Sequence, residues 1–291
     1  MMNAARRRLV PYFLLGPGLI WLLLFFAVPM YYMGELALRS GSLDEGFRFT
    51  WELANFPDAL SDNSTQFARS FLYAGIATAL SLAIAYPLAY AIAFRAGRWR
   101  NLLLFLVIAP FFTTYLIRTL AWQTILSDES PAVDVLAFIG AVPDGGRVLD
   151  TPGSVIAGLT YNFLPFMVLP IYASLERLDR SLIEAATDLY ASARTAFLKV
   201  TLPLSAPGVV AGTLLTFIPA SGDYVNALFL GSRNQAMIGN VIQNNYLVTN
   251  NYPDAAALSF VLMAVILALV VIYIRFAGSE ALMGDEGEQA R

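Results

Sequence analysis

Long apolar runs recur along the chain, separated by shorter stretches that carry most of its charges. Six of these runs are each about 20 residues long, close to the length that a helix needs to cross a bilayer. They predict membrane-spanning helices over 12–33, 71–94, 102–126, 153–174, 207–230 and 256–276. We therefore expect an all-α integral membrane protein with about six transmembrane helices.

The same pattern divides the chain into three parts. Residues 1–11 form a short N-terminal segment, 12–276 the transmembrane domain, and 277–291 a polar tail that we expect to be disordered. The first apolar run follows Arg6, Arg7 and Arg8, as the core of a signal peptide would. It extends to Met33 without a small-x-small cleavage site, so we expect a helix that is retained.

Composition supports a membrane protein and excludes several kinds of chemistry. Charged residues make up 13% of the chain, about half of their share in a soluble domain. The chain contains no Cys and no His, which excludes disulfides, a thiol nucleophile, a His-based triad and zinc held by these residues. It has no P-loop motif either. We expect no catalytic residue, metal or cofactor on this chain.

The placement of Lys and Arg predicts the orientation. With a cytoplasmic N-terminus, the cytoplasmic side holds Arg6, Arg7, Arg8, Arg95, Arg98, Arg100, Arg177, Arg180, Arg194, Lys199, Arg275 and Arg291. The outer side holds only Arg39, Arg48, Arg69, Arg147 and Arg233. Positive residues concentrate on the cytoplasmic side of membrane proteins, so we expect both termini in the cytoplasm. The outer segments 34–70, 127–152 and 231–255 would then form an external docking surface.

A polar segment between the fourth and fifth runs reads SLIEAATDLYASARTAFLKVTLPLSAPG, residues 181–208. Ser181 and Glu184 fit a capping box at a helix start, and apolar positions recur at helical spacing. Pro203 and Pro207 end the segment. The pattern predicts a cytoplasmic amphipathic helix. From the residues alone, this helix either lies flat on the lipid surface or is presented to another protein.

Residues of this segment resemble the EAA motif of permease subunits of binding-protein-dependent ABC importers. The similar positions are Glu184-Ala185-Ala186, Asp188-Leu189, Val200-x-Leu202-Pro203 and Pro207-Gly208. The resemblance implies a type I ABC importer permease-like bundle in the bacterial inner membrane. It also implies that the loop 176–206 carries a coupling helix near 182–195, which docks on a separate ATPase. The implied coupling residues are Glu184, Ala185, Ala186, Asp188, Leu189 and Tyr190.

The resemblance also implies partners. These are a second permease subunit that completes a heterodimer, two ATPase subunits, an extracytoplasmic substrate-binding protein and membrane lipid, with no nucleic acid. ATP and Mg are expected on the partner ATPase. Where the family usually has Gly, this chain has Tyr190. Tyr resists positive φ, so we expect the turn after the helix to differ, or Tyr190 to pack on the partner or the bundle.

Three further stretches are similar to the first permease subunit of spermidine/putrescine importers. They are PFFTTYLIRTLAW at 110–122, FIPASGDYVNALFLG at 217–231 and MIGNVIQNNY at 237–246. The resemblance implies import of polyamines. Aromatic faces attract ammonium groups, and an acidic residue in a span would do the same. The candidate pathway residues are Asp223, Tyr224, Asn226, Tyr115, Arg118, Trp122, Tyr161, Asn162 and Phe166.

Two charges within the predicted spans leave alternatives open. Arg118 lies in the third span and Asp223 in the fifth, beside Pro219 and Gly222, which we expect to break the helix. Buried charges in a membrane pair with one another or face a polar path. Either Arg118 and Asp223 form a structural ion pair, or Asp223 faces the path and Arg118 turns away.

The alternatives for function are a permease of the same type for another small solute, such as an anion, a sugar or iron, and a stand-alone secondary transporter or channel. An anionic solute would give Arg118 a role. A secondary transporter would need ion-coupling acids in its own spans, and Asp223 is the only one we place firmly there.

Overall fold

The computed structural model describes residues 15–140 and 146–277. Within these residues, four single helices are long and apolar enough to cross a membrane, and two bent helix pairs bring the count to six if each pair is one span. The single helices are Leu15–Ala37, Ser64–Phe94, Pro152–Glu176 and Tyr252–Arg275. They confirm the predicted spans one, two, four and six, with ends displaced by a few residues. The N-terminal segment 1–11 and tail residues 278–291 lie outside the described residues.

The third span is not the continuous helix that the sequence predicts. Gly97–Phe112 and Tyr115–Ile125 meet at an angle of 95°. The bend falls at Thr113 and Thr114, whose backbones are extended, shortly after Pro110. Proline removes a helical hydrogen bond and disfavours helix before it. Because the chain changes direction here, the first amide groups of Tyr115–Ile125 have no carbonyl partner in the preceding helix.

The fifth span, predicted at 207–230, directly follows a bend and is itself divided at Gly222. Ala193–Leu204 and Ala206–Ser221 meet at 61°, close to the prolines predicted to end the polar segment. The chain then leaves the helix at Gly222 and re-enters a short helix at Val225. The break predicted near Gly222 is thus confirmed, whereas Pro219 remains inside the helix.

The described chain forms two compact units. Unit 1 comprises the residues up to Asn63 together with Ile242–Met263. In its N-terminal part lie η1 (Leu23–Ala27), α2 (Val28–Ala37), the antiparallel pair β1 (Arg39–Ser40) and β2 (Arg48–Phe49), and α3 (Asn55–Asp62). The Asn55 side chain donates hydrogen bonds to the carbonyls of Ala37 and Arg39, at 2.9 and 3.0 Å, and so fixes α3 to the end of α2.

Unit 2 comprises Ser64–Val241 and the residues from Ala264 onward. Its elements in chain order are α4 (Ser64–Phe94), η2 (Gly97–Trp99), α5 (Arg100–Ile108), η3 (Ala109–Phe112), α6 (Tyr115–Ile125), α7 (Pro131–Phe138), α8 (Pro152–Glu176), α9 (Arg180–Asp188), α10 (Ala193–Ala196), η4 (Phe197–Thr201), α11 (Leu202–Leu204), α12 (Ala206–Ser221), α13 (Val225–Leu230) and η5 (Arg233–Gln235). Two continuous helices, α14 (Ile238–Leu247) and α15 (Tyr252–Ala277), run through the boundaries between the units.

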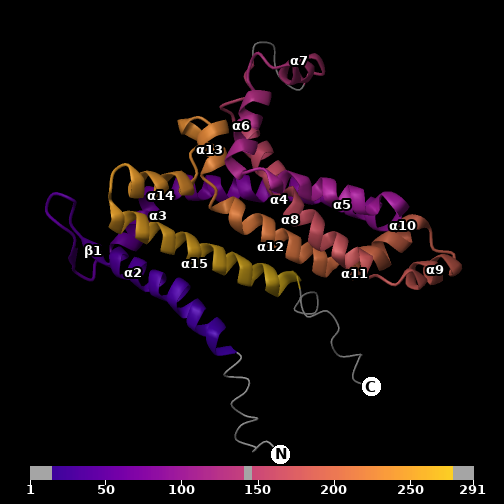
Figure 1. Cartoon of the computed structure of the whole chain (residues 1–291), viewed down its shortest axis with the longest axis horizontal. Coiled ribbons are helices and arrows are strands. Elements are labelled where there is room, and N and C mark those ends of the chain that lie inside the picture. The colour runs from indigo at the N-terminus through magenta and orange to yellow at the C-terminus, as the bar shows by residue number, and fades with distance from the viewer. Residues whose placement is uncertain (1–14, 141–145, 278–291) are drawn as a thin grey trace, which may run out of the picture. The chain divides into compact units, whose positions relative to one another are not determined.

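Helices α4, α8 and α12 pack side by side as the core of unit 2 (Figure 1). Small side chains make this close approach possible, as is common between helices in membranes. On α12, a Cβ added at Gly208 would lie 2.6 Å from the carbonyl oxygen of Pro170 on α8. Helices α9 to α11 lie at one end of the unit, and α6, α7 and α13 lie away from that end (Figure 1).

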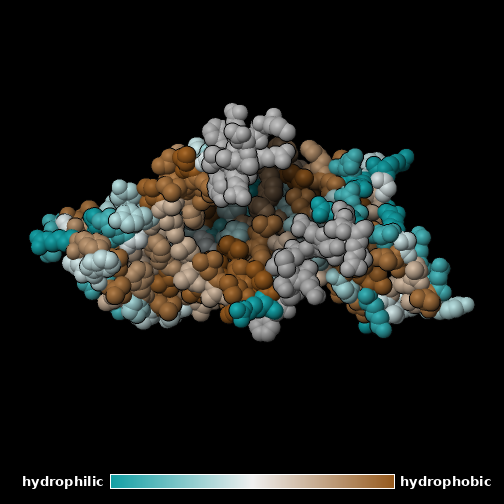
Figure 2. Space-filling view, turned by 90° about the horizontal axis from the view of Figure 1, so that it is seen from below, coloured by the Kyte–Doolittle hydropathy of each residue, from teal (hydrophilic) through white to brown (hydrophobic). Residues whose placement is uncertain are grey.

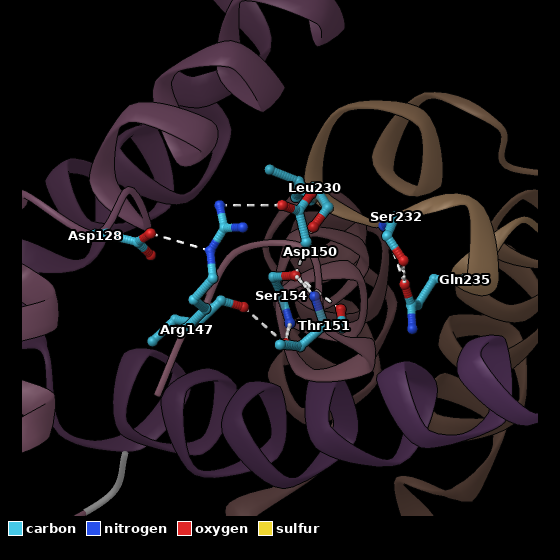
Figure 3. A network of polar contacts seen from close by, with 9 residues as sticks. Asp128, Arg147, Asp150, Thr151, Ser154, Leu230, Ser232 and Gln235 are labelled. Carbon is cyan, nitrogen blue, oxygen red and sulfur yellow. Dashed lines mark hydrogen bonds and ion pairs between the residues drawn. The ribbon is translucent and has the colours of Figure 1, made fainter. Parts of the chain in front are cut away.

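A polar network fixes the start of α8. Thr151 and Ser154 form a capping box, and the Ser154 hydroxyl also donates to the carbonyl of Leu230 at 2.7 Å. Arg147 lies between Asp128 and Asp150, at 3.0 and 3.2 Å (Figure 3). These contacts hold the loop before α8 against the end of α13.

Hydrophobic side chains cover much of the visible helix surface, as expected for surfaces that face lipid (Figure 2). Hydrophilic side chains gather at the end of unit 2 that carries α9 (Figure 2). The surface therefore agrees with a membrane bundle that has one polar end at α9.

Candidate functional site

A buried polar cluster forms where two helix breaks meet in unit 2. The Tyr115 hydroxyl, at the start of α6, donates a short hydrogen bond to Oδ2 of Asp223, in the turn between α12 and α13. The side-chain amide of Asn226 donates to the Tyr115 oxygen at 2.6 Å. The backbone amide of Asn226 donates to Oδ1 of Asp223 at 2.8 Å. Both carboxylate oxygens of Asp223 therefore accept a bond from this chain.

The cluster continues to the middle of α8. Nδ2 of Asn162 donates to Oδ1 of Asn226 at 3.1 Å and to the Thr119 hydroxyl at 3.3 Å. Asn162, Asn226 and Thr119 are almost completely buried, and Asp223 is 8% exposed. On α8, a Cβ added at Gly158 would lie 2.6 Å from Oδ1 of Asn226, so glycine is needed for the approach. Side-chain hydrogen bonds thus connect α6, α8 and the α12–α13 turn.

The structure does not contain the Arg118–Asp223 ion pair that was one alternative. None of the four ion pairs among the described residues includes Arg118. Its guanidinium instead lies 5.3 Å from the ring centre of Phe111 and 5.5 Å from that of Tyr115. The tyrosine hydroxyl takes the place that the arginine would have filled beside Asp223.

A pocket with a volume of about 440 Å³ opens beside the cluster. Arg118, Asn162, Tyr115 and Phe166 are among its lining residues. Oδ1 of Asn162 is buried there without a hydrogen-bond partner in the described residues. The pocket is therefore lined by aromatic faces and one cation, and an unpartnered acceptor is buried in its wall.

The remaining predicted pathway residues lie outside the hydrogen-bonded cluster. The rings of Trp122 and Tyr161 pack on each other with centres 5.4 Å apart. The side chain of Tyr224 is 41% exposed, and its carbonyl accepts a bond from Asn240 at 2.8 Å. The ring of Phe166 is 38% exposed and lies 5.1 Å from Phe111.

Five residues of the site were absent from the sequence-based set: Phe111, Thr113, Thr114, Thr119 and Phe163. Thr119 follows Tyr115 by four residues, so helical spacing alone places both on one face of α6. Phe163 lies next to Asn162 on α8 and packs on Tyr115 with ring centres 6.1 Å apart. For Phe111, the bend after η3 decides the position, and the sequence pattern did not predict that bend.

The predicted coupling segment is a separate short helix, α9, and not one helix over 182–195. It begins earlier than predicted, and its N-cap is Asp179, not Ser181. The Asp179 carboxylate accepts from the Ser181 backbone amide at 2.9 Å. This hydrogen bond, with a second from the Ser181 side chain, holds the pKa of Asp179 below its ordinary value. Ser181 is thus inside the first turn, and the predicted capping box with Glu184 is wrong.

The turn after α9 keeps the backbone conformation that glycine would favour. Tyr190 has φ +60°. Its amide donates to the Thr187 carbonyl at 2.9 Å, and the amide of Ala191 donates to the Ala186 carbonyl at 3.1 Å. This pair of bonds is a Schellman motif with tyrosine at the left-handed position. The expectation that tyrosine would change the turn, or pack on this bundle, is therefore wrong: the side chain is 99% exposed.

Helix α9 buries no residue within the chain. Glu184, Ala185, Asp188 and Leu189 are exposed, and Ala186 is half-buried. Among the described residues, one hydrogen bond joins α9 to α4: Nη2 of Arg180 donates to the Ala93 carbonyl at 3.2 Å, near the last residue of that helix. The guanidinium also lies 5.6 Å from the ring centre of Phe94. The segment is thus a polar helix projecting from the bundle, held at its base.

Comparisons with known proteins agree with these features. Residues 85–279 match the family described as the binding-protein-dependent transport system inner membrane component. The chain is 34% identical over 256 residues to the spermidine/putrescine transport system permease protein PotB of Haemophilus influenzae, covering 88% of this chain and 90% of that protein. Over 200 residues it is 40% identical to PotB of Escherichia coli K12, covering 69% of this chain and 73% of that protein.

A solved structure shares the fold. It is the bacterial alginate ABC transporter in complex with an alginate pentasaccharide-bound periplasmic protein, with a TM-score of 0.68, 19% identity, and coverage of 95% of this chain and 96% of that one. The resemblance read from residues 184–208 is confirmed by the family match, and the type I ABC importer permease-like fold by this structure. The chain belongs to the family of inner membrane components of binding-protein-dependent transport systems.

Proposed function

We propose that this chain is the permease subunit that carries polyamines, such as spermidine and putrescine, through an ATP-driven importer. The observation that carries the proposal is the identity to spermidine/putrescine permeases over most of the chain. The chemistry of the polar cluster supports the proposal, because a buried carboxylate, aromatic rings and an unpartnered amide oxygen lie close together in unit 2.

The ligand groups that the site would recognise are ammonium groups. A carboxylate offers about four lone-pair positions, and Asp223 uses two of them for Tyr115 and Asn226. The remaining positions and the unpartnered Oδ1 of Asn162 are buried, so an ammonium group would bind them only after the surrounding side chains move apart. Ring faces of Tyr115 and Phe166 would add cation–π attraction, about 0.5–2 kcal/mol for each close contact. Trp122, Tyr161 and Tyr224 would line the path farther from the carboxylate.

The partners of this chain complete the importer. A second permease of similar fold would supply the other half of the path, and a substrate-binding protein would deliver the solute from outside. Two ATPase subunits carrying ATP and Mg would bind below. The excess of Lys and Arg on one side supports a cytoplasmic location for both termini and α9.

Helix α9 would dock on the ATPase through its exposed residues from Glu184 to Tyr190. No residue of α9 is fully buried and most are exposed, so much of the helix surface is free for a partner. Closure of the ATPases would push α9, and the bond from Arg180 to the Ala93 carbonyl would pass that motion to the end of α4. Because α4 packs on α8, the displacement would reach the helix that carries Asn162.

One observation favours a second candidate, a permease of the same type for an anionic solute. Arg118 lines the pocket with no ion-pair partner among the described residues. A guanidinium in this position attracts anions and repels polyamines. The two candidates therefore predict opposite charge preferences, which a transport assay separates.

The test uses the whole importer, co-expressed with its neighbouring subunits and reconstituted in liposomes. We would measure ATP hydrolysis and uptake of radiolabelled spermidine with the loaded binding protein, for wild type and Asp223→Asn. Asp44→Asn is the matched control, since Asp44 is exposed in the loop after β1. Stimulation by spermidine, lost in Asp223→Asn and kept in Asp44→Asn, would support the proposal. A complex that assembles but ignores polyamines would refute the choice of solute.

A further inference from the structure

Arg118 occupies an unusual position for a charged residue. It lies one turn into α6, directly after the 95° bend, and is 9% exposed. Two aromatic rings flank its guanidinium, those of Phe111 and Tyr115. Cation–π contacts stabilise the charge but do not neutralise it.

The guanidinium lacks an acceptor in its own chain. Its Nε and Nη1 atoms are buried without a hydrogen-bond partner in the described residues. Asp223, the nearby acid of the cluster, instead accepts from the Tyr115 hydroxyl and the Asn226 amide. A buried, unpaired charge is strongly unfavourable at membrane depth, so the working protein needs an acceptor at this place.

The backbone adds to the positive potential. Helix α6 begins at Tyr115, and no side chain caps its first amides, because Thr114 makes no capping bond. The first amides of a helix point along its axis without an intrahelical partner and attract negative charge. Thr113 and Thr114 line the pocket at this terminus, next to Arg118. The helix terminus and the guanidinium therefore favour the same kind of ligand.

We propose that this pocket, lined by Arg118 and the N-terminus of α6, binds one carboxylate-sized anion. The planar guanidinium matches a carboxylate through two parallel hydrogen bonds, which gives the site its preference. The anion is either the side chain of an Asp or Glu in a span of the second permease, or a free small anion. In both cases it neutralises Arg118, so that a polycation can pass close to Asp223. The inference rests on the proposed polyamine function for its role, but not for the binding itself.

Binding is measured first, without substrate, on the complete importer in nanodiscs. The probe is sodium formate, exchanged at constant ionic strength for a bulky organosulfonate. A free-anion site predicts that formate raises the melting temperature of the wild type and not that of Arg118→Met. Arg118→Lys keeps the charge but not the two parallel bonds, and should show a weaker response. Arg48→Met, in the exposed strand β2, is the control and should respond as the wild type does.

Transport identifies the source of the anion. With a free anion, spermidine uptake should fall about tenfold or more when formate is removed, as for the loss of one charge-assisted contact. With a protein carboxylate, uptake should ignore the anion. In a double-mutant cycle, the effect on uptake of neutralising one acidic residue in the spans of the second permease should then not add to the effect of Arg118→Lys.

The outcomes separate the two proposals. Suppose that formate raises the melting temperature of the wild type but not of Arg118→Met, and that the importer does not transport polyamines. This result supports the anion site and rejects the polyamine function. The anion site itself is overturned if formate changes neither melting temperature nor uptake and no acidic residue of the second permease couples to Arg118→Lys.

Discussion

The turn after α9 allows a sharp test, because tyrosine stands at a left-handed backbone position. Tyr190 has φ +60°, and its side chain is 99% exposed. Replacing it by glycine removes the Cβ that disfavours this conformation and removes no packing within the chain. We expect Tyr190→Gly to make the turn more stable.

The size of the effect follows from two opposing contributions. A left-handed residue with a Cβ costs about 1–2 kcal/mol. Glycine gains conformational entropy in the open state, which offsets roughly 0.4–1 kcal/mol. The net stabilisation is therefore about 1 kcal/mol, or about a fivefold smaller population of the opened turn.

Hydrogen exchange measures this population directly. The informative amides are those of Tyr190 and Ala191, which donate to the Thr187 and Ala186 carbonyls. In the importer stripped of its ATPase subunits, their protection should rise about fivefold in Tyr190→Gly. Tyr190→Ala is the matched control, since it removes the ring but keeps the Cβ, and its protection should stay near the wild-type value.

The same variant also tests coupling. If the exposed ring contacts the ATPase, Tyr190→Gly and Tyr190→Ala should both reduce ATP-driven uptake although only the first stabilises the turn. Unchanged or lower protection in Tyr190→Gly would refute the assignment of strain to this residue. Wild-type uptake in both variants would refute a role of the ring in docking.

Three further predictions concern packing, the polar cluster and pH. Gly208→Ala should lower the stability of the complex by about 1–3 kcal/mol, because the added Cβ would lie 2.6 Å from the Pro170 carbonyl oxygen. Gly75→Ala is the control, since an added Cβ there meets no atom within 4 Å, and thermal unfolding of that variant should change little. Tyr115→Phe should cost about 1–3 kcal/mol, because Oδ2 of Asp223 and Nδ2 of Asn226 would each lose the hydroxyl that they contact. Equal melting temperatures of this variant and the control Tyr90→Phe would contradict the network. Since the pKa of Asp179 is held low by the Ser181 amide, its stabilisation of α9 is present above the ordinary aspartate pKa and lost as pH falls through the lowered value. Amide exchange in α9 should accelerate over that acid range in the wild type, and a pH profile for Asp179→Asn with the same acid step would show that another group is responsible.

The sequence by itself determined the class of protein and most of its helices. Apolar runs long enough to cross a bilayer located spans one, two, four and six, because a helix in lipid must be apolar along its whole length. Residues 184–208 also identified the family, since their types and spacing carry the resemblance that the family match confirms. The break near Gly222 was also predicted from local sequence, because a glycine interrupts an apolar run there.

Tertiary structure decided how these elements meet. The 95° bend at Thr113 and Thr114 is not encoded in the apolar pattern, because hydropathy does not report backbone direction. That bend brings Tyr115 to Asp223 and leaves Arg118 beside two aromatic rings. It thereby decides against the ion pair between Arg118 and Asp223, one of the two alternatives that the sequence left open. The left-handed turn at Tyr190 was likewise imposed by the two hydrogen bonds that close α9, against the local preference of the residue. Local sequence determines which segments are helical, whereas a buried polar group can find its partner far along the chain, as Tyr115 and Asn226 do at a separation of 111 positions.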